Sequence, residues 1–138
     1  MKKKNHTCDH IGLLSGNAKR LAKFYTKKLG FKKTKEELLP TSIMQPIFHI
    51  SCDCIFIKLV SGNVMIELFE PTSLSMRRRH SDTAGIHHWG YCVGDREKFV
   101  SQLKKKNVKI ITVKRNDHSV YFITDPDGNR IEIRDNKK

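Results

Sequence analysis

Residues 125–134 read Asp-Pro-Asp-Gly-Asn-Arg-Ile-Glu-Ile-Arg, a tight turn that runs directly into a short strand. Proline, aspartate, asparagine and glycine favour turns, and the isoleucines that follow favour a strand with one buried face. Because alternate residues of a strand face opposite sides, Glu132 must face away from Ile131 and Ile133. A carboxylate among strand aliphatics is costly to bury unless it is paired or bound to a metal. Glu132 is therefore the first candidate site residue.

This strand has a counterpart earlier in the chain. Residues 64–68 read Val-Met-Ile-Glu-Leu and match residues 129–133, Asn-Arg-Ile-Glu-Ile, at an offset of 65 residues. The match pairs Glu67 with Glu132. Two such carboxylates at equivalent places are harder to explain as ordinary surface residues than either one alone.

The beginning of the chain is duplicated as well. Residues 9–12, Asp-His-Ile-Gly, match residues 87–90, His-His-Trp-Gly, at an offset of 78 residues, which pairs His10 with His88. The first copy therefore carries 13 extra residues between its matching ends, which is the difference between the offsets of 78 and 65. We expect them in the loose, proline-containing stretch around residues 36–50. The chain is predicted to be a tandem repeat.

Hydrophobic periodicity and turn residues predict the same order of elements in each copy. In the first copy, these are a strand over 7–15, a helix from the Ser15-Gly16-Asn17 cluster to Gly30 and, after the loose stretch, strands at about 48–60 and 64–69. In the second copy, they are a strand over 86–93, a helix at about 96–106, and strands at about 109–114, 119–124 and 130–134. We therefore predict one domain over residues 1–138, with module 1 at about 7–70, a polar connector at 71–85 and module 2 at about 86–134.

Composition predicts a soluble globular protein. The apolar fraction is 38%, the charged fraction is 30%, and the net charge of +13 is interpreted as a generally basic surface. No recognised motif accompanies the charge and the aromatic residues are not clustered, so nucleic-acid binding is not expected. There is no apolar stretch after the first lysines and none long enough to cross a membrane, so a cytoplasmic location is expected. The four cysteines (Cys8, Cys52, Cys54 and Cys92) are expected to be small buried core residues without disulfides.

Two histidines and two glutamates at matching positions make a candidate metal site, His10, Glu67, His88 and Glu132. A lone strand histidine or glutamate usually faces water, but that interpretation weakens when four such residues occupy matching positions of a repeat. Imidazole and carboxylate donors suit Zn, Ni, Co, Mn or Fe(II), with one or two waters completing the coordination. We expect one divalent metal ion. Along the strand, His87 is expected to face the other way from His88.

Four phrases give the chain a resemblance to a known family. They are His-Ile-Gly-Leu at 10–13, Lys-Phe-Tyr-Thr-Lys-Lys-Leu-Gly-Phe at 23–31, Val-Met-Ile-Glu-Leu at 64–68 and Phe-Ile-Thr-Asp-Pro-Asp-Gly-Asn-Arg-Ile-Glu at 122–132. Over residues 7–134 the sequence resembles the vicinal oxygen chelate superfamily, which includes glyoxalase I, bleomycin-resistance proteins and extradiol dioxygenases. The resemblance implies an α+β fold in which two tandem βαβββ modules form a curved sheet cleft around one Zn, Ni, Co or Mn ion, held by the same four positions. It also implies a homodimer, with the cleft completed within one chain or by exchange of modules.

Within that superfamily, the His, Glu, His, Glu set looks most like that of glyoxalase I. Extradiol dioxygenases and fosfomycin-modifying enzymes lack a carboxylate at the position of Glu67, and methylmalonyl-CoA epimerases typically place glutamine there. Glyoxalase I itself typically holds glutathione with an arginine and an asparagine where this chain has Leu14 and Pro71. A small-molecule substrate other than the glutathione hemithioacetal is therefore left open. An anionic one would suit the run Arg77-Arg78-Arg79-His80, although such runs are more often solvated loops.

The implied reaction is that of a metal-dependent lyase or isomerase. The metal polarises the substrate oxygens and stabilises an enediolate, while a carboxylate moves a proton between adjacent carbons. Glu132 is the predicted base and Glu67 its counterpart for the other face, so that both are ligands and catalytic residues. One alternative is an acyl-CoA epimerase of the methylmalonyl-CoA epimerase type. Another is a non-catalytic drug-binding module of the bleomycin-resistance type, with an apolar, metal-free cleft.

Overall fold

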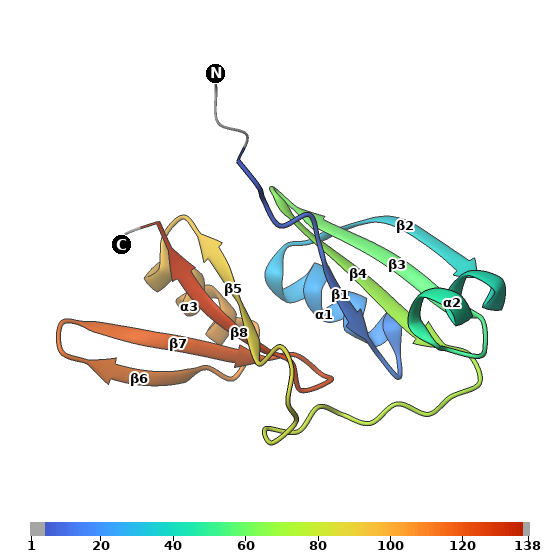
Figure 1. Cartoon of the computed structure of the whole chain (residues 1–138). Helices are drawn as coiled ribbons and strands as arrows, with labels where there is room; N and C mark the ends of the chain where they lie inside the picture. The colour runs from blue at the N-terminus through green and yellow to red at the C-terminus, as the bar shows by residue number, and fades with distance from the viewer. Residues whose placement is uncertain (1–4, 137–138) are drawn as a thin grey trace. The chain divides into compact units, whose positions relative to one another are not determined.

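The computed structural model describes residues 5–136, and the chain divides into two compact units with the boundary between Met76 and Arg77. Each unit is built around one four-stranded mixed sheet (Figure 1). The lysines at positions 2–4, 137 and 138 lie outside the described residues. Within residues 5–136, none of the helices has the length and apolar character needed to cross a membrane.

Unit 1 contains four strands and two helices. In chain order they are β1 (Ile11–Leu14), α1 (Ala18–Leu29), β2 (Lys32–Leu39), α2 (Thr41–Phe48), β3 (Cys54–Ser61) and β4 (Val64–Pro71). The strand order is β1-β4-β3-β2, with β1 parallel to β4 and the other neighbours antiparallel.

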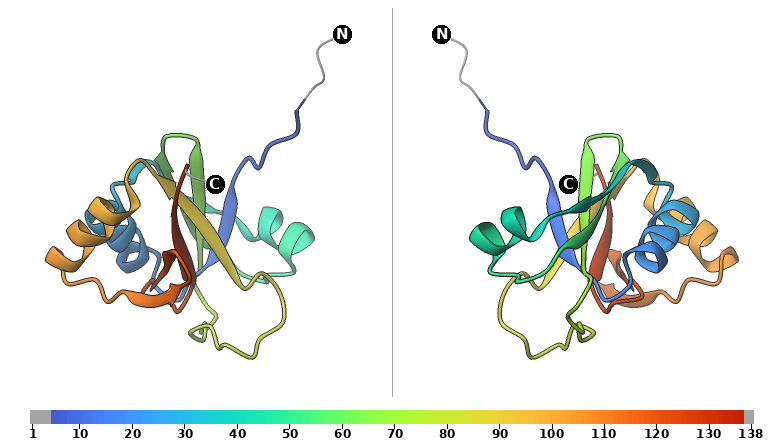
Figure 2. Two further views of the ribbon diagram at one scale, coloured as in Figure 1. Left: turned by 90° about the vertical axis from the view of Figure 1, so that its left-hand side faces the viewer. Right: turned by 90° about the vertical axis from the view of Figure 1, so that its right-hand side faces the viewer.

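Unit 2 repeats this arrangement without the second helix. Its elements are β5 (His88–Val93), α3 (Arg96–Lys105), β6 (Ile111–Arg115), β7 (His118–Thr124) and β8 (Arg130–Asp135). The strand order is β5-β8-β7-β6, again with one parallel pair, β5 and β8. Figure 2 shows α1 and α3 each against one face of the sheet of its own unit. The predicted α+β fold of two tandem βαβββ modules is therefore confirmed.

Equivalent residues begin the long helix of each unit. Asn17 caps α1 by accepting a hydrogen bond from Arg20 N at 3.0 Å. Asp95 caps α3 in the same way, accepting from Lys98 N at 3.1 Å. Capping oxygens satisfy N–H groups that the first helical turn cannot pair internally. Gly30 ends α1 with φ at 80°, a left-handed conformation that favours glycine.

The core of each unit lies between its long helix and one face of its sheet. In unit 1, Leu21 and Tyr25 of α1 are fully buried, as are Ile66 and Leu68 of β4. Because strand residues alternate in facing, this leaves Glu67 on the sheet face away from α1. Packing of the helix thus decides which face of the sheet carries the predicted carboxylate, and unit 2 repeats the pattern with its buried isoleucines on either side of Glu132.

The stretch around residues 36–50 differs from the prediction of a loose segment. It contains the end of β2 and all of α2, and β3 begins at Cys54 rather than near residue 48. Pro40 stands before α2 as its N-cap, and Pro46 is tolerated inside the helix. The helix is anchored from outside, because Asp53 Oδ1 accepts hydrogen bonds from Thr41 N and Thr41 Oγ1, both at 2.7 Å. The extra residues of the first copy are in the predicted place, but they form a helix.

Two further predictions about histidines need correction. β1 begins at Ile11 rather than residue 7, so His10 precedes the strand. β5 begins at His88, so His87 also precedes its strand and the alternation of facing does not apply to it. The two ring nitrogens Nδ1 of His87 and His88 lie 2.8 Å apart, so His87 does not face away from His88.

The cysteines divide into two pairs. All four are free, as predicted, and Cys52 and Cys54 are buried in unit 1. Cys8 and Cys92 are exposed, so the prediction of burial was wrong for them. Cys8 lies before β1, and Cys92 occupies the face of β5 opposite the buried residues Trp89 and Tyr91.

Candidate metal centre

Sheet register places the predicted ligands at equivalent positions in the two units. In unit 1, Gly12 of β1 lies opposite Glu67 of β4. In unit 2, Gly90 of β5 lies opposite Glu132 of β8. Each predicted histidine ligand stands two residues before that glycine. The repeat inferred from spacing is therefore also a repeat in the pairing of the strands.

In unit 1 the structure brings the predicted pair together. His10 Nε2 lies 3.2 Å from Glu67 Oε1, and the two side chains are 42% and 17% exposed. Asp9 Oδ2 lies 2.8 Å from His10 Nδ1, so the imidazole is held between two carboxylates. A carboxylate on the outer nitrogen of a ligating histidine fixes the ring and makes it a better donor. His10 Nε2 and the Glu67 carboxylate therefore suit a shared metal ion.

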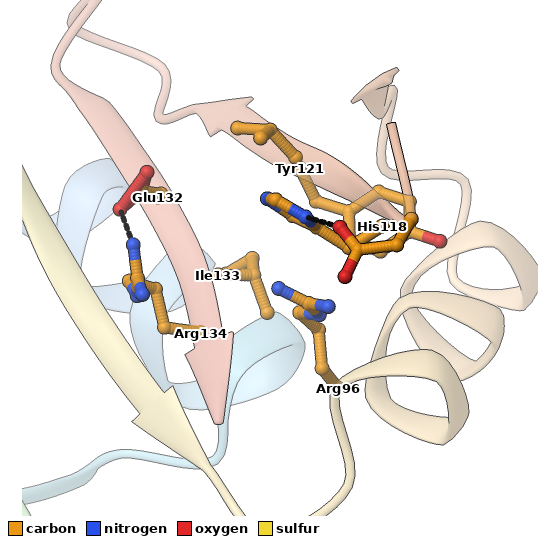
Figure 3. A pocket seen from close by; sticks show the side chains of 8 residues that line it. Arg96, His118, Tyr121, Glu132, Ile133 and Arg134 are labelled. Atoms are coloured by element: carbon orange, nitrogen blue, oxygen red, sulfur yellow. Dashed lines mark hydrogen bonds and ion pairs between the residues drawn. The ribbon is translucent and has the colours of Figure 1, made fainter. Parts of the chain in front are cut away.

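In unit 2 the predicted pair shares a sheet face, and His88 and Glu132 each make their polar contact with another residue. The Glu132 side chain is 19% exposed, and its Oε2 lies 3.4 Å from Arg134 Nη1 (Figure 3). The His88 ring packs edge-on against Phe122, with centroids 5.2 Å apart, and Phe122 lies opposite Glu132 in the register. The contact between His88 Nδ1 and His87 leaves Nε2 of His88 for coordination.

Each unit thus offers a half-site, which we define as one imidazole and one carboxylate: His10 and Glu67 in unit 1, His88 and Glu132 in unit 2. Within neither unit do the described residues gather three or more His, Cys, Asp or Glu side chains into a metal cluster. Imidazole nitrogen and carboxylate oxygen donors suit a Zn, Ni, Co or Mn ion. The donor chemistry of each half-site therefore fits a divalent metal.

A cavity of about 390 Å³ in unit 2 is lined in part by Glu132. β7 begins at His118 but pairs with β8 only from Tyr121 onward, so the two strands separate at this end. Arg96, from the start of α3, lies over the Tyr121 ring, 5.7 Å from its centroid (Figure 3). Arg134 also lines the cavity.

Tyr121 and Asp117 line this cavity, and the pKa of each is shifted further from neutral pH. The Tyr121 hydroxyl donates a hydrogen bond to Glu97 Oε2 at 2.6 Å, and this bond, followed by burial, raises the pKa of Tyr121. The hydrogen bond from the His118 ring, with Nδ1 and Oδ1 2.9 Å apart, lowers the pKa of Asp117. The phenol stays protonated and the Asp117 carboxylate stays ionised, which leaves Glu132 as the carboxylate of interest here.

Sequence reasoning missed the residues that hold the ligands. Asp9 and Arg134 each contact a predicted ligand, but neither was singled out. The available signals were that Asp9 is an acid directly before His10, and that Arg134 shares a strand face with Glu132 at a spacing of two residues.

A sequence model of the Glyoxalase/Bleomycin resistance protein/Dioxygenase superfamily matches residues 7–133. The chain belongs to this superfamily. This glyoxalase-superfamily chain is similar to "Uncharacterized protein YwkD" of Bacillus subtilis (strain 168), at 23% identity over 128 residues, covering 90% of this chain and 92% of the relative.

Two solved structures show the same fold as this superfamily member. The glyoxalase family protein from Enterococcus faecalis has a TM-score of 0.71 and 21% identity, covering 92% of this chain and 95% of that chain. The trypanothione-dependent glyoxalase I of Leishmania major has a TM-score of 0.67 and 22% identity, covering 96% of this chain and 88% of that chain. At these identities the likeness supports the fold and no particular activity.

Neither Leu14 nor Pro71 offers this glyoxalase-superfamily chain an ionic handle for a substrate. Leu14 is 49% exposed and lies opposite Phe69 in the register. Pro71 is buried opposite Cys54 at the end of β4. The residue that lies opposite each of them in the register is apolar as well.

The basic connector makes main-chain contacts within unit 2. Arg78 Nε donates to Pro126 O at 3.3 Å, and Arg79 N donates to Asp127 O at 2.9 Å. Arg79 Nη2 donates to Thr83 O at 3.3 Å. These two arginines therefore help to hold the connector against the turn that precedes β8.

Proposed function

We propose that this chain is a metal-dependent lyase or isomerase of the glyoxalase type, which moves a proton between two adjacent carbons beside a carbonyl group. The proposal rests on one observation: Glu67 and Glu132 occupy the same register position, opposite Gly12 and Gly90, in two copies of one sheet. A single strand glutamate is ordinarily a surface residue. Two that are mostly withdrawn from water at equivalent places, one of them against a histidine, are not explained by a surface role.

His10, Glu67, His88 and Glu132 are the proposed ligands of one divalent ion, with Zn, Ni, Co and Mn as the candidates. When bound, the ion would polarise substrate oxygens and so make the neighbouring C–H group more acidic. Asp9 would keep the His10 ring oriented with Nε2 toward Glu67. Members of this superfamily commonly bind a divalent metal, which agrees with the donor set.

Glu132 is the proposed base. Its side chain is 19% exposed, and its contact with Arg134, at 3.4 Å, is long for a charge-assisted hydrogen bond. A substrate can therefore displace Arg134 without losing a strong interaction. The freed carboxylate accepts a proton from one carbon and returns it to the next. Glu67 serves the opposite face of the substrate in the same way.

The thiol handle of glyoxalase I is not part of the proposal. The resemblance places glutathione-holding side chains at the positions of Leu14 and Pro71, and neither residue carries a polar side chain. We infer a substrate whose reacting carbons are those of a glyoxalase substrate but whose remaining part is held differently.

Exchange of substrate deuterium with water tests the proposal. Metal-loaded protein is incubated with deuterated hemithioacetals and acyl-CoA thioesters, and washout is followed by NMR. We expect washout from a hemithioacetal, and a loss of rate of at least about 100-fold in Glu132→Gln, the scale of a general base. Glu37→Gln, which changes an exposed glutamate that pairs with Lys35, should retain the rate.

Each other outcome of that experiment has a distinct meaning. Washout from the thioesters alone would replace the lyase with an acyl-CoA epimerase. Full turnover in Glu132→Gln would contradict the assignment of the base. Absence of exchange from every substrate, together with no retained metal, would favour the non-catalytic drug-binding module.

A further inference from the structure

Unit 1 contains an apolar cavity of about 290 Å³ on the sheet face that carries the His10–Glu67 pair. Glu67 and Phe69 are two residues apart in β4 and so face the same side. Gly12 lies opposite Glu67, and Leu14 lies opposite Phe69. Gly12, Leu14 and Phe69 all line the cavity, so it begins directly beside the proposed half-site.

Helix α2 supplies the other wall of the cavity. Met44 is fully buried, and Phe48 is half exposed with its ring packed on Phe69 at a centroid distance of 5.4 Å. Ile50, just after the helix, completes this side, and no charged side chain is among the described residues that line the cavity. The wall is fixed in place because the first residue of α2, Thr41, is bound by Asp53 through two hydrogen bonds of 2.7 Å.

This apolar character belongs to unit 1 and is not a requirement of the repeated fold. The offset of 65 residues maps Phe69 onto Arg134, and the offset of 78 maps Leu14 onto Cys92. The described residues of unit 2 contain no counterpart of α2. Helix α2 and the two apolar residues are thus additions that shape one side of one half-site.

We propose that this cavity is a subsite for the apolar, non-reacting part of the substrate. The inference rests on the proposed function and deepens it, because it names the substrate class as a small carbonyl compound with an aryl or alkyl substituent. A dry apolar cavity of about 150 Å³ accepts benzene, so the volume here suits a group of about six to eight carbons. Burial of that group provides the binding that a polar handle at Leu14 or Pro71 would otherwise provide.

The subsite can be tested in the metal-free protein. Four methionines give four methyl signals after ¹³C-methyl labelling, and Met44 lines the cavity whereas Met65 and Met76 do not. Benzyl alcohol should shift the Met44 signal saturably and leave the Met65 and Met76 signals in place. An unchanged Met44 signal overturns the subsite. So does a Met44 signal that shifts with protein concentration alone, because a second copy of the chain would then cover the cavity.

A matched pair of α2 variants makes the result specific. Phe48→Ala removes a wall of the cavity and should weaken benzyl alcohol binding about tenfold, the effect of losing part of one aromatic contact. Ile47→Ala changes a neighbouring side chain that is 61% exposed and does not line the cavity, and it should bind as the parent does. Equal weakening in both variants would mean that α2 was disturbed as a whole, and would overturn the assignment of the wall to Phe48.

The link to the proposed metal site is tested with two hydroxamates that share one chelating group. Zn²⁺-loaded protein should bind benzohydroxamate about tenfold or more tightly than acetohydroxamate, and Phe48→Ala should remove that preference. Equal affinities, or a preference that survives Phe48→Ala, would overturn the substrate class. Failure of Zn²⁺, Ni²⁺, Co²⁺ and Mn²⁺ all to bind would overturn the proposed function and the substrate class with it, while the Met44 signal would still report separately on the cavity.

Discussion

His10 lies between two carboxylates, with Asp9 on Nδ1 at 2.8 Å and Glu67 on Nε2 at 3.2 Å. If Nε2 is a metal ligand, Asp9 acts through the ring by orienting it. Because the Asp9 side chain is 83% exposed, Asp9→Asn should lower Zn²⁺ affinity by about tenfold, the lower end of the range for such partners. Isothermal titration measures this directly. Asp82→Asn, an exposed aspartate in the connector, should leave the affinity as it is, and equal affinities in both variants would count against a role for Asp9.

Gly128 is a second residue whose surroundings decide the effect of a substitution. Its φ is +87°, and a Cβ there would lie 2.9 Å from Arg79 O in the connector. Gly62 also has a positive φ, +55°, but a Cβ there would meet no atom within 4 Å. We expect Gly62→Ala to lower the free energy of unfolding by about 1 kcal/mol, and Gly128→Ala by about 1–3 kcal/mol more. Urea unfolding of both variants tests this, and equal losses would show that the connector gives way easily.

At the residue scale, the four proposed ligands could be predicted from the sequence because the repeat places a histidine and a glutamate at matching positions in both copies. The register of Glu67 and Glu132 opposite Gly12 and Gly90 then followed from strand pairing. Contacts such as Glu132 with Arg134 could not be predicted, because they depend on side-chain rotamers that spacing alone does not fix.

Helix α2 is the element that sequence reasoning did not predict, because the stretch around residues 36–50 was expected to be loose. Pro40 and Pro46 indicate a break when they are read locally, because proline lacks the N–H that an interior helical turn needs. The residue that anchors the helix, Asp53, lies 12 residues beyond Thr41 and reaches it only in the folded unit. Long, strongly periodic elements such as α1 were predicted well because their own sequence contains the caps and the buried stripe.

The anchoring of α2 should depend on pH through Asp53. Hydrogen bonds from the Thr41 hydroxyl and then from its backbone N–H lower the pKa of Asp53 below the ordinary value. A carboxyl group whose pKa is lowered by folding stabilises the folded state above its unfolded pKa of about 4. That contribution is lost as the pH falls through the lower, folded pKa. Amide exchange in α2 should therefore accelerate, relative to α1, as the pH is taken below about 4.

Substitution of Asp53 separates this effect from general acid unfolding. In Asp53→Asn the excess exchange of α2 over α1 should already be present at neutral pH and should change little on acidification. Asp82→Asn should retain the pH dependence of the parent protein. If α1 and α2 lose protection together at every pH in the parent, Asp53 does not anchor α2 independently.

At the scale of the whole molecule, the proposed metal needs both units, because each half-site has only two protein donors. The resemblance leaves open whether one chain or two chains of a homodimer complete a site. Mixing Glu67→Gln chains with Glu132→Gln chains distinguishes these arrangements. Exchange of modules in a dimer predicts recovery of about a quarter of the parent sites, since half of the dimers are mixed and one of their two sites has all four ligands. A site within one chain predicts no recovery.

The repeat also explains how much of the whole molecule could be predicted from the sequence. It predicted two modules with one His and one Glu each, and the structure confirms the two modules. The net charge of +13 did not identify a partner, because such a charge bears on association in general and not on one ligand. Two of the cationic residues, Arg78 and Arg79, make local hydrogen bonds with the turn before β8.

Metal titration of the purified, metal-free protein tests the central claim most directly. Isothermal titration with Zn²⁺, Ni²⁺, Co²⁺ or Mn²⁺ should show one ion bound per chain. A metal at 1,000 times its Kd should stabilise the native state by about 4 kcal/mol and raise Tm accordingly. Glu67→Gln and Glu132→Gln should each weaken that binding, whereas Glu37→Gln should not. Absence of binding for all four ions, or binding that is unchanged in both ligand variants, would contradict the account.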